Sequence, residues 1–132
     1  MSEPRKRVGC VIVAHGTVAE CLMDGIQGIL GKQTGWVTVS NRGLSLKDLN
    51  DEVARAVQRL KKDHEVIIFS DMPGGSCHHA CQEFLRHESE VRVVSGLNLM
   101  MLLEFFVKRE HKPLDQLLNL IIDRGRDSVR LI

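Results

Sequence analysis

The segment Glu65-Val-Ile-Ile-Phe-Ser-Asp-Met-Pro-Gly-Gly-Ser76 combines an apolar run, a turn and the start of a helical pattern. Residues 65–70 include β-branched and aromatic side chains without polar alternation, which is typical of a strand buried on both faces. The Pro-Gly-Gly triplet ends this strand, and a helix is expected from Ser76 to about His87. A buried strand that turns directly into a helix is the repeating unit of a parallel α/β sheet.

The same alternation of strand and helix extends over the rest of the chain. Apolar runs and helical spacing predict strands at 8–14, 36–39 and 91–95 and helices at 18–30, 46–60, 99–109 and 113–125. Gly125 is expected to end the last helix, and weak alternation in residues 127–132 predicts a short edge strand. Because parallel strands need crossover connections, the sequence predicts one α/β domain over residues 1–132, with a three-layer, doubly wound sheet.

Composition and charge exclude several classes of protein. Lys and Arg number 18 and Asp and Glu number 17, so the net charge gives no footprint for nucleic acid. The basic run 5–7 resembles the start of a signal peptide, but the apolar run behind it is short and breaks at His15. No later segment has the character of a membrane span. We therefore expect a cytoplasmic protein with reduced cysteines, without membrane insertion or nucleic-acid binding.

Candidate functional residues follow the predicted strands. In an open α/β sheet, ligands bind beyond the carboxyl ends of the strands. His15 and Gly16 follow the first strand, and residues 71–76 follow the third. If the first and third strands are neighbours, His15 and Asp71 emerge side by side.

A histidine beside a carboxylate has a specific chemistry. The Asp71 carboxylate can accept a hydrogen bond from one ring nitrogen of His15, which fixes the tautomer and leaves the other nitrogen free as a nucleophile. Gly74, Gly75 and Ser76 open a helix whose N–H groups and dipole favour an anion. Together these parts predict a site for a phosphoryl group on a histidine. Each part also has a structural alternative: a packing histidine, a turn-capping carboxylate and an ordinary helix start.

Four segments of the chain resemble one protein family. They are Val-Ala-His15-Gly, Ile-Leu-Gly31-Lys-Gln, Ser70-Asp-Met-Pro-Gly-Gly-Ser76 and Val94-Ser-Gly-Leu-Asn-Leu-Met-Met-Leu-Leu-Glu104. In this order they resemble the mannose-family enzyme IIA of the bacterial phosphoenolpyruvate:sugar phosphotransferase system. The resemblance runs from about Val8 to the C-terminus.

The resemblance implies both a fold and a function. It implies four parallel strands in the order 2-1-3-4 and an antiparallel C-terminal edge strand that is exchanged between the subunits of a homodimer. It implies that His15 is the phosphorylated histidine and Asp71 the carboxylate that orients it. The residues expected to bind the phosphoryl group are Gly16, Gly74, Gly75 and Ser76. In the family this group arrives from the small phosphocarrier protein HPr and leaves for a IIB component, and no cofactor or metal is implied.

Three alternatives remain open at this point. The chain has Ser76-Cys-His-His79 where the family usually has Ser-Pro-Phe-Asn, and Ala14 and Met100 also depart from the pattern. These departures leave open a regulatory module that does not serve sugar transport. Cys77, His78 and Cys81 suggest a small zinc site, although a second ligand pair at metal spacing is missing from the sequence. A nucleotide-binding domain ranks last, because the first turn lacks both the Gly-x-Gly-x-x-Gly and the Walker patterns.

Overall fold

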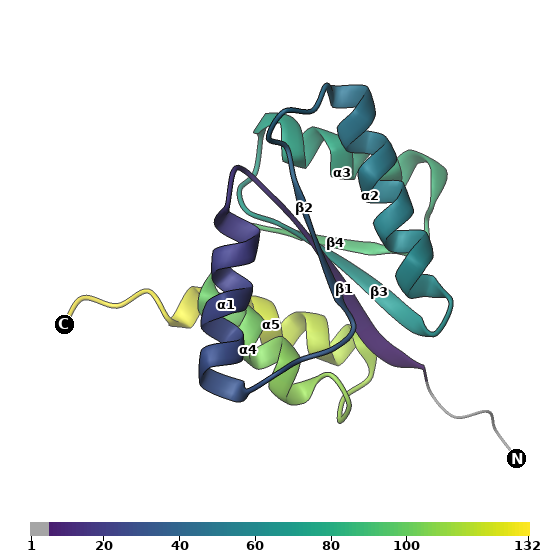
Figure 1. Cartoon of the computed structure of the whole chain (residues 1–132). Helices are drawn as coiled ribbons and strands as arrows, with labels where there is room; N and C mark the ends of the chain where they lie inside the picture. Colours follow the sequence, from purple (N-terminus) through teal and green to yellow (C-terminus); the bar gives the residue numbers. More distant parts are fainter. Residues whose placement is uncertain (1–5) are drawn as a thin grey trace, which may run out of the picture.

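The computed structural model describes residues 6–132, which form a four-stranded parallel sheet (Figure 1). Its strands are β1 (Arg7–Ala14), β2 (Trp36–Ser40), β3 (His64–Ser70) and β4 (Arg92–Ser95). They lie in the order β2-β1-β3-β4, and every pairing is parallel. The predicted parallel sheet and its order are therefore confirmed, and β1 and β3 are neighbours.

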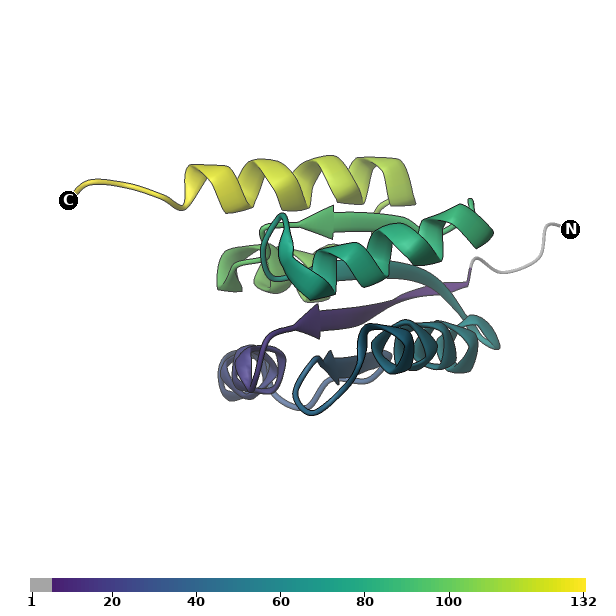
Figure 2. The same cartoon turned by 90° about the horizontal axis from the view of Figure 1, so that it is seen from above.

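Helices cover both faces of this sheet. In the described part of the chain they are α1 (Val18–Leu30), α2 (Leu46–Lys61), α3 (Gly75–His87), α4 (Leu99–Lys108) and α5 (Leu114–Asp127). Helices α1, α4 and α5 pack on one face, and α2 and α3 pack on the other (Figure 1, Figure 2). This is the predicted three-layer arrangement. Among residues 6–132, no helix combines the length and the apolar character that crossing a bilayer requires.

Strand β1 contributes to both hydrophobic layers. Its side chains alternate between the two faces of the sheet. Cys10 and Ile12 pack in the cluster with α1, α4 and α5, whereas Val11 and Val13 pack in the cluster with α2 and α3. All four side chains are fully buried. A strand covered on both faces needs an apolar residue at every position, which explains the unbroken apolar run in the sequence.

Helix α5 is longer than the sequence pattern predicted. It continues through Gly125 to Asp127, so the prediction that Gly125 ends this helix is wrong. Gly125 is buried against α4, and a Cβ atom added there would lie 2.4 Å from Cγ of Met101. The Asn98 side chain also donates a hydrogen bond to the Gly125 carbonyl over 3.2 Å. The glycine therefore permits a close approach of two helices and does not serve as a stop.

The C-terminal edge strand expected at residues 127–132 is absent from the sheet that residues 6–132 form. Helix α5 takes up the chain as far as Asp127, and residues 128–132 follow it without forming a strand. These residues extend away from the body of the molecule (Figure 1). Their apolar side chains are highly exposed, at 81% for Val129, 103% for Leu131 and 118% for Ile132. An exchange of this segment between subunits is likewise not seen in the single chain.

Candidate functional site

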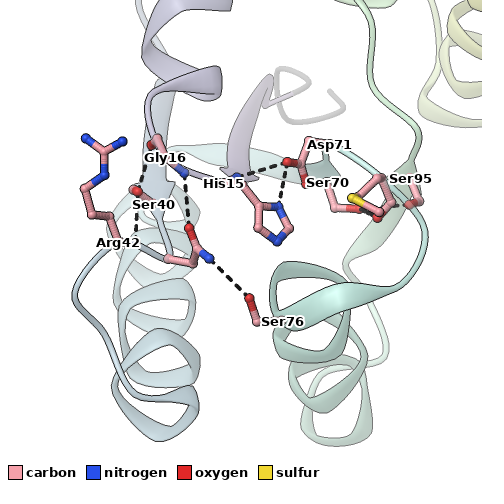
Figure 3. A network of polar contacts seen from close by, with 10 residues as sticks. His15, Gly16, Ser40, Arg42, Ser70, Asp71, Ser76 and Ser95 are labelled. Carbon is pink, nitrogen blue, oxygen red and sulfur yellow. Dashed lines mark hydrogen bonds and ion pairs between the residues drawn. The ribbon is translucent and has the colours of Figure 1, made fainter.

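The carboxyl ends of the strands meet at one edge of the sheet, where the polar residues gather. The strand register pairs Ala14 with Ser40, Val13 with Ser70, and Ser70 with Ser95. Because β1 lies between β2 and β3, the loops that follow these strands surround the residue after β1 (Figure 3). That residue is His15.

His15 and Asp71 are joined by two hydrogen bonds. Nδ1 of the His15 ring lies 2.8 Å from Oδ2 of Asp71. The same oxygen accepts a hydrogen bond from the His15 backbone N–H over 3.0 Å (Figure 3). The side chain of His15 is 37% exposed, and that of Asp71 is 13% exposed. The predicted hydrogen bond between the two residues is therefore confirmed.

The Asp71 carboxyl group is held in its ionised form. Burial tends to raise its pKa, but the hydrogen bonds from the backbone and ring of His15, together with the charge of His15, outweigh burial. The pKa of Asp71 is therefore lowered from its ordinary value. An ionised carboxylate can only accept a hydrogen bond here, so in the neutral form of the His15 ring Nδ1 carries the hydrogen and Nε2 has the free lone pair.

The free nitrogen of His15 faces the start of helix α3. A Cβ atom added to Gly75 would lie 3.4 Å from both Nε2 and Cε1 of the ring, and Gly75 has a φ of +79°. Glycine is therefore the residue that allows both this backbone conformation and this close approach. Gly74 is the N-cap residue, and no side chain of residues 6–132 caps the first turn by hydrogen bonding. The unpaired N–H groups of this turn lie beside the histidine, where they favour a negatively charged group.

Asn41, which follows β2, connects the turn after His15 with the start of α3. Oδ1 of Asn41 accepts a hydrogen bond from the Gly16 backbone N–H over 3.1 Å. Nδ2 of Asn41 donates to Oγ of Ser76 over 3.4 Å. The Ser40 hydroxyl donates to the Gly16 carbonyl over 2.8 Å. The β2 end therefore holds the turn after His15 and links it to the first turn of α3.

Asn41 and Ser40 are not among the site residues predicted from the sequence, although a signal for both was present. They follow a predicted strand, and the same argument that selected His15 and Asp71 applies to every strand of a parallel sheet. The predicted site drew only on the ends of the first and third strands. By contrast, Asn98 at the end of β4 serves its own helix, because its Oδ1 accepts from the Met101 N–H over 3.1 Å.

The sequence suggestion of a site at Cys77, His78 and Cys81 does not match the arrangement of the side chains. In the part of the chain that the structure describes, the three-residue group that could hold a metal consists of His15, Asp71 and Cys77. Cys77 and Cys81 are both buried. Burial, followed by the negative charge of Asp71, raises the pKa of the Cys77 thiol to about 11. Burial also raises the pKa of the Cys81 thiol to about 12, so both cysteines are neutral thiols at physiological pH.

The chain matches a known protein family. Residues 9–122 match the family described as "PTS system fructose IIA component", named EIIA-man. The chain belongs to the EIIA-man family. The resemblance seen in the sequence is thereby confirmed, and this member of the family is an EIIA phosphocarrier of the bacterial phosphotransferase system.

Two characterised relatives of this EIIA-man chain carry different sugar names. The "PTS system fructose-specific EIIA component" of Bacillus subtilis (strain 168) is 27% identical over 113 residues, which are 85% of this chain and 77% of that protein. The "PTS system mannose-specific EIIAB component" of Escherichia coli (strain K12) is 27% identical over 128 residues, or 95% of this chain. Those residues are only 39% of the Escherichia coli protein, so the chain spans less than half the length of that relative.

Solved structures agree with the EIIA-man fold. The crystal structure of phosphotransferase system component EIIA from Streptococcus agalactiae superposes with a TM-score of 0.81 at 26% identity, covering 94% of this chain and 96% of that one. The PTS IIA protein associated with the fucose utilization operon from Streptococcus pneumoniae gives a TM-score of 0.86 at 20% identity, covering 98% and 96%. The second likeness concerns the fold alone.

Proposed function

We propose that this EIIA-man chain is a cytoplasmic carrier that accepts a phosphoryl group from phospho-HPr on Nε2 of His15 and passes it to a IIB component. One observation carries the proposal. Nδ1 of His15 is held 2.8 Å from the Asp71 carboxylate, while Nε2 faces the uncapped start of α3 beside Gly75. A nucleophile, the group that orients it and an anion-binding helix end thus lie together.

The transfer step balances without a cofactor. The lone pair of Nε2 attacks the phosphorus atom, a new P–N bond forms on His15, and the P–N bond of phospho-HPr breaks. The electron pair of the broken bond returns to the imidazole of HPr. The His15 ring, which keeps its hydrogen on Nδ1, becomes cationic, and the ionised Asp71 carboxylate stabilises that charge. In the second transfer, a nucleophile of the IIB component attacks the phosphorus atom and forms a bond to it, the P–N bond of His15 breaks, and its electron pair returns to Nε2.

The phosphoryl oxygens need hydrogen-bond donors, and the backbone around Nε2 supplies them. In our proposal the first turn of α3, which begins at Gly75 and includes Ser76, faces these oxygens. Gly74 and Gly16 have φ values of 87° and 55°, and both shape the turns that border the ring. Positioning and electrostatic stabilisation of this kind account for most of the catalysis of phosphoryl transfer.

Incubation of the full chain with phosphoenolpyruvate, enzyme I and HPr tests this function. We expect the chain to take up an equimolar amount of phosphate in a bond that is labile in acid and stable in alkali, as expected for phosphohistidine. The phosphorylated chain should then lose its label when a IIB component of the same system is added. A chain that takes up no phosphate would contradict the carrier function. It would indicate an interaction module that has the EIIA-man fold but does not transfer a phosphoryl group.

We also propose that Asn41 is a positioning residue for His15. Its side chain is hydrogen-bonded to the Gly16 N–H and the Ser76 hydroxyl, through which it acts on His15. In an Asn41→Ala chain, we expect kcat for phosphorylation to fall by roughly tenfold, because small displacements of reacting groups are costly. The KM for phospho-HPr is expected to stay unchanged, since the residue acts through the turn after His15.

The matched control for this prediction is Asn119→Ala, which removes an exposed amide on α5. Its kcat and KM should equal those of the wild-type chain. Thermal unfolding of both variants identifies any general loss of stability. An unchanged kcat in Asn41→Ala would show that the bridge between the two turns has no role in the transfer.

We further propose that residues 128–132 of one chain pair with the β4 edge of a second copy. Strand β4 lies at the edge of the sheet, where unpaired backbone groups can accept another strand. The groove beside it has a mixed lining, whose apolar members include Val93, Val94, Met101 and Ile122. Apolar side chains exposed at the C-terminus match this groove in character, and their burial in a partner would remove them from water.

Light scattering tests the exchange. We expect the full chain to have the mass of a dimer at micromolar concentration, and a chain that lacks residues 129–132 to have the mass of a monomer. The truncation keeps the whole of α5, so loss of the dimer reports on the tail itself. A monomeric full-length chain, or a truncated chain that remains a dimer, would contradict the exchange.

A further inference from the structure

Cys77 lies beside the proposed phosphoryl site and has no part in the transfer described above. It belongs to the first turn of α3, and its side chain is completely buried. Its Sγ, a ring nitrogen of His15 and a carboxylate oxygen of Asp71 all lie within 4.8 Å of one another. Nitrogen, oxygen and sulfur donors therefore converge from the β1 end, the β3 end and the start of α3.

The spacing of these donors is close to that of a tetrahedral zinc site. The usual zinc bond lengths place neighbouring ligand atoms about 3.3 to 3.6 Å apart. Nδ1 of His15 and Oδ2 of Asp71 are 2.8 Å apart across their hydrogen bond, and no pair in the group exceeds 4.8 Å. An adjustment of about one ångström completes the geometry. The half-exposed His15 ring can make that movement by rotation of its side chain.

Asp71 has a free oxygen that the phosphoryl chemistry leaves unexplained. Oδ2 accepts both hydrogen bonds from His15, whereas Oδ1 is buried and has no hydrogen-bond partner among residues 6–132. A buried oxygen of a carboxylate without a partner is unfavourable. A cation held by this carboxylate would remove that cost, and the neighbouring sulfur selects for a metal that accepts soft ligands.

We propose that His15, Asp71 and Cys77 form a Zn²⁺ site whose occupation excludes phosphorylation of His15. The ion replaces the thiol proton of Cys77, which passes to solvent. The hydrogen of the neutral His15 ring moves from Nδ1 to Nε2, so that Nδ1 can bind the ion and Nε2 loses its free lone pair. No electron is transferred. Three protein ligands leave the fourth tetrahedral position to water. The proposed binding of zinc depends only on the three ligand residues. The competition with the phosphoryl group, in contrast, rests on the proposed carrier function.

Direct metal titration of the full chain tests the site. Cys21 is exposed and could bind metal by itself, so all variants carry Cys21→Ser. In this background we compare Cys77→Ser with Cys81→Ser, which changes a buried cysteine one helical turn away and outside the donor group. Zn²⁺ affinity is measured by calorimetry, and Co²⁺ serves as a probe because a bound thiolate gives it a charge-transfer absorption band.

We expect equimolar Zn²⁺ binding in the background chain and in Cys81→Ser, and an affinity lowered by roughly tenfold or more in Cys77→Ser. The thiolate band of Co²⁺ should be present in the first two chains and absent from the third. Equal affinity in all three chains, or a background chain without this band at saturating Co²⁺, would overturn the proposal. If Cys77→Ser fails to fold in metal-free buffer, Cys77→Ala takes its place in the comparison.

The competition is tested separately. Zn²⁺ should slow phosphorylation of the background chain by phospho-HPr. Conversely, the affinity of the chain for Zn²⁺ should be lost once His15 is phosphorylated. Undiminished Zn²⁺ binding to the phosphorylated chain would contradict the exclusion. A chain that binds Zn²⁺ but is not phosphorylated at all would contradict the carrier function and leave the metal site standing.

Discussion

A His15→Ala chain is expected to take up no phosphoryl group from phospho-HPr under conditions in which the wild-type chain is fully labelled. Alanine has no ring nitrogen, and the proposed nucleophile is therefore lost completely. The substitution should preserve the fold, because the His15 side chain is 37% exposed and lies at the sheet edge outside both hydrophobic clusters. Labelling with radioactive phosphoenolpyruvate measures the uptake, and thermal unfolding checks the fold.

The matched control for this experiment is His79→Ala. His79 lies in α3, the helix whose first residue faces the His15 ring, and is exposed. The His79→Ala substitution is expected to leave the extent of labelling unchanged. Label in the His15→Ala chain would falsify the assignment and direct the search to His78 and His79.

The position of the site could be predicted because it follows from topology. The apolar runs identify buried strands, and the alternation with helices makes those strands parallel. All carboxyl ends then lie at one edge, so two residues as far apart in the chain as His15 and Asp71 become neighbours. A second histidine–carboxylate pair shows why this argument is needed. His64 and Asp63 lie 2.7 Å apart, but they stand at the amino end of β3, away from the α3 start.

Features that depend on packing could not be predicted in the same way. Gly125 follows an apolar helical pattern and has the appearance of a helix stop, yet its role is to admit Met101. Only the contact between α4 and α5 distinguishes the two roles.

The neighbours of Cys77 likewise could not be predicted from the sequence pattern. Helical spacing placed it with Cys81, whereas its position in the folded chain places it with His15 and Asp71.

An Asp71→Asn chain is expected to transfer phosphate more slowly by roughly ten- to a thousandfold, the range that positioned acid–base groups usually contribute. The amide oxygen of asparagine can still accept the hydrogen from Nδ1 of His15, so the tautomer and the shape of the site are kept. The negative charge that stabilises the cationic phosphohistidine ring is lost. The loss should therefore lower kcat and leave the KM for phospho-HPr close to the wild-type value.

The same substitution has a predictable effect on stability as the pH changes. Because the pKa of Asp71 is lowered in the folded chain, its ionised form stabilises the fold. This contribution is fully present above the pKa of an aspartate in the unfolded chain, and it is lost as the pH falls through the lowered value of the folded chain. The difference in Tm between wild type and Asp71→Asn should accordingly be largest near neutral pH and shrink under acidic conditions.

Asp63→Asn provides the control that separates charge at the site from charge elsewhere. It neutralises the carboxylate of the other histidine pair, at the opposite end of β3, and should leave the transfer rate unchanged. A wild-type rate in Asp71→Asn would mean that Asp71 only caps its turn. A raised KM with an unchanged kcat would assign it to the docking of HPr. Only a lowered kcat, confined to Asp71→Asn, agrees with a carboxylate that stabilises the phosphorylated ring.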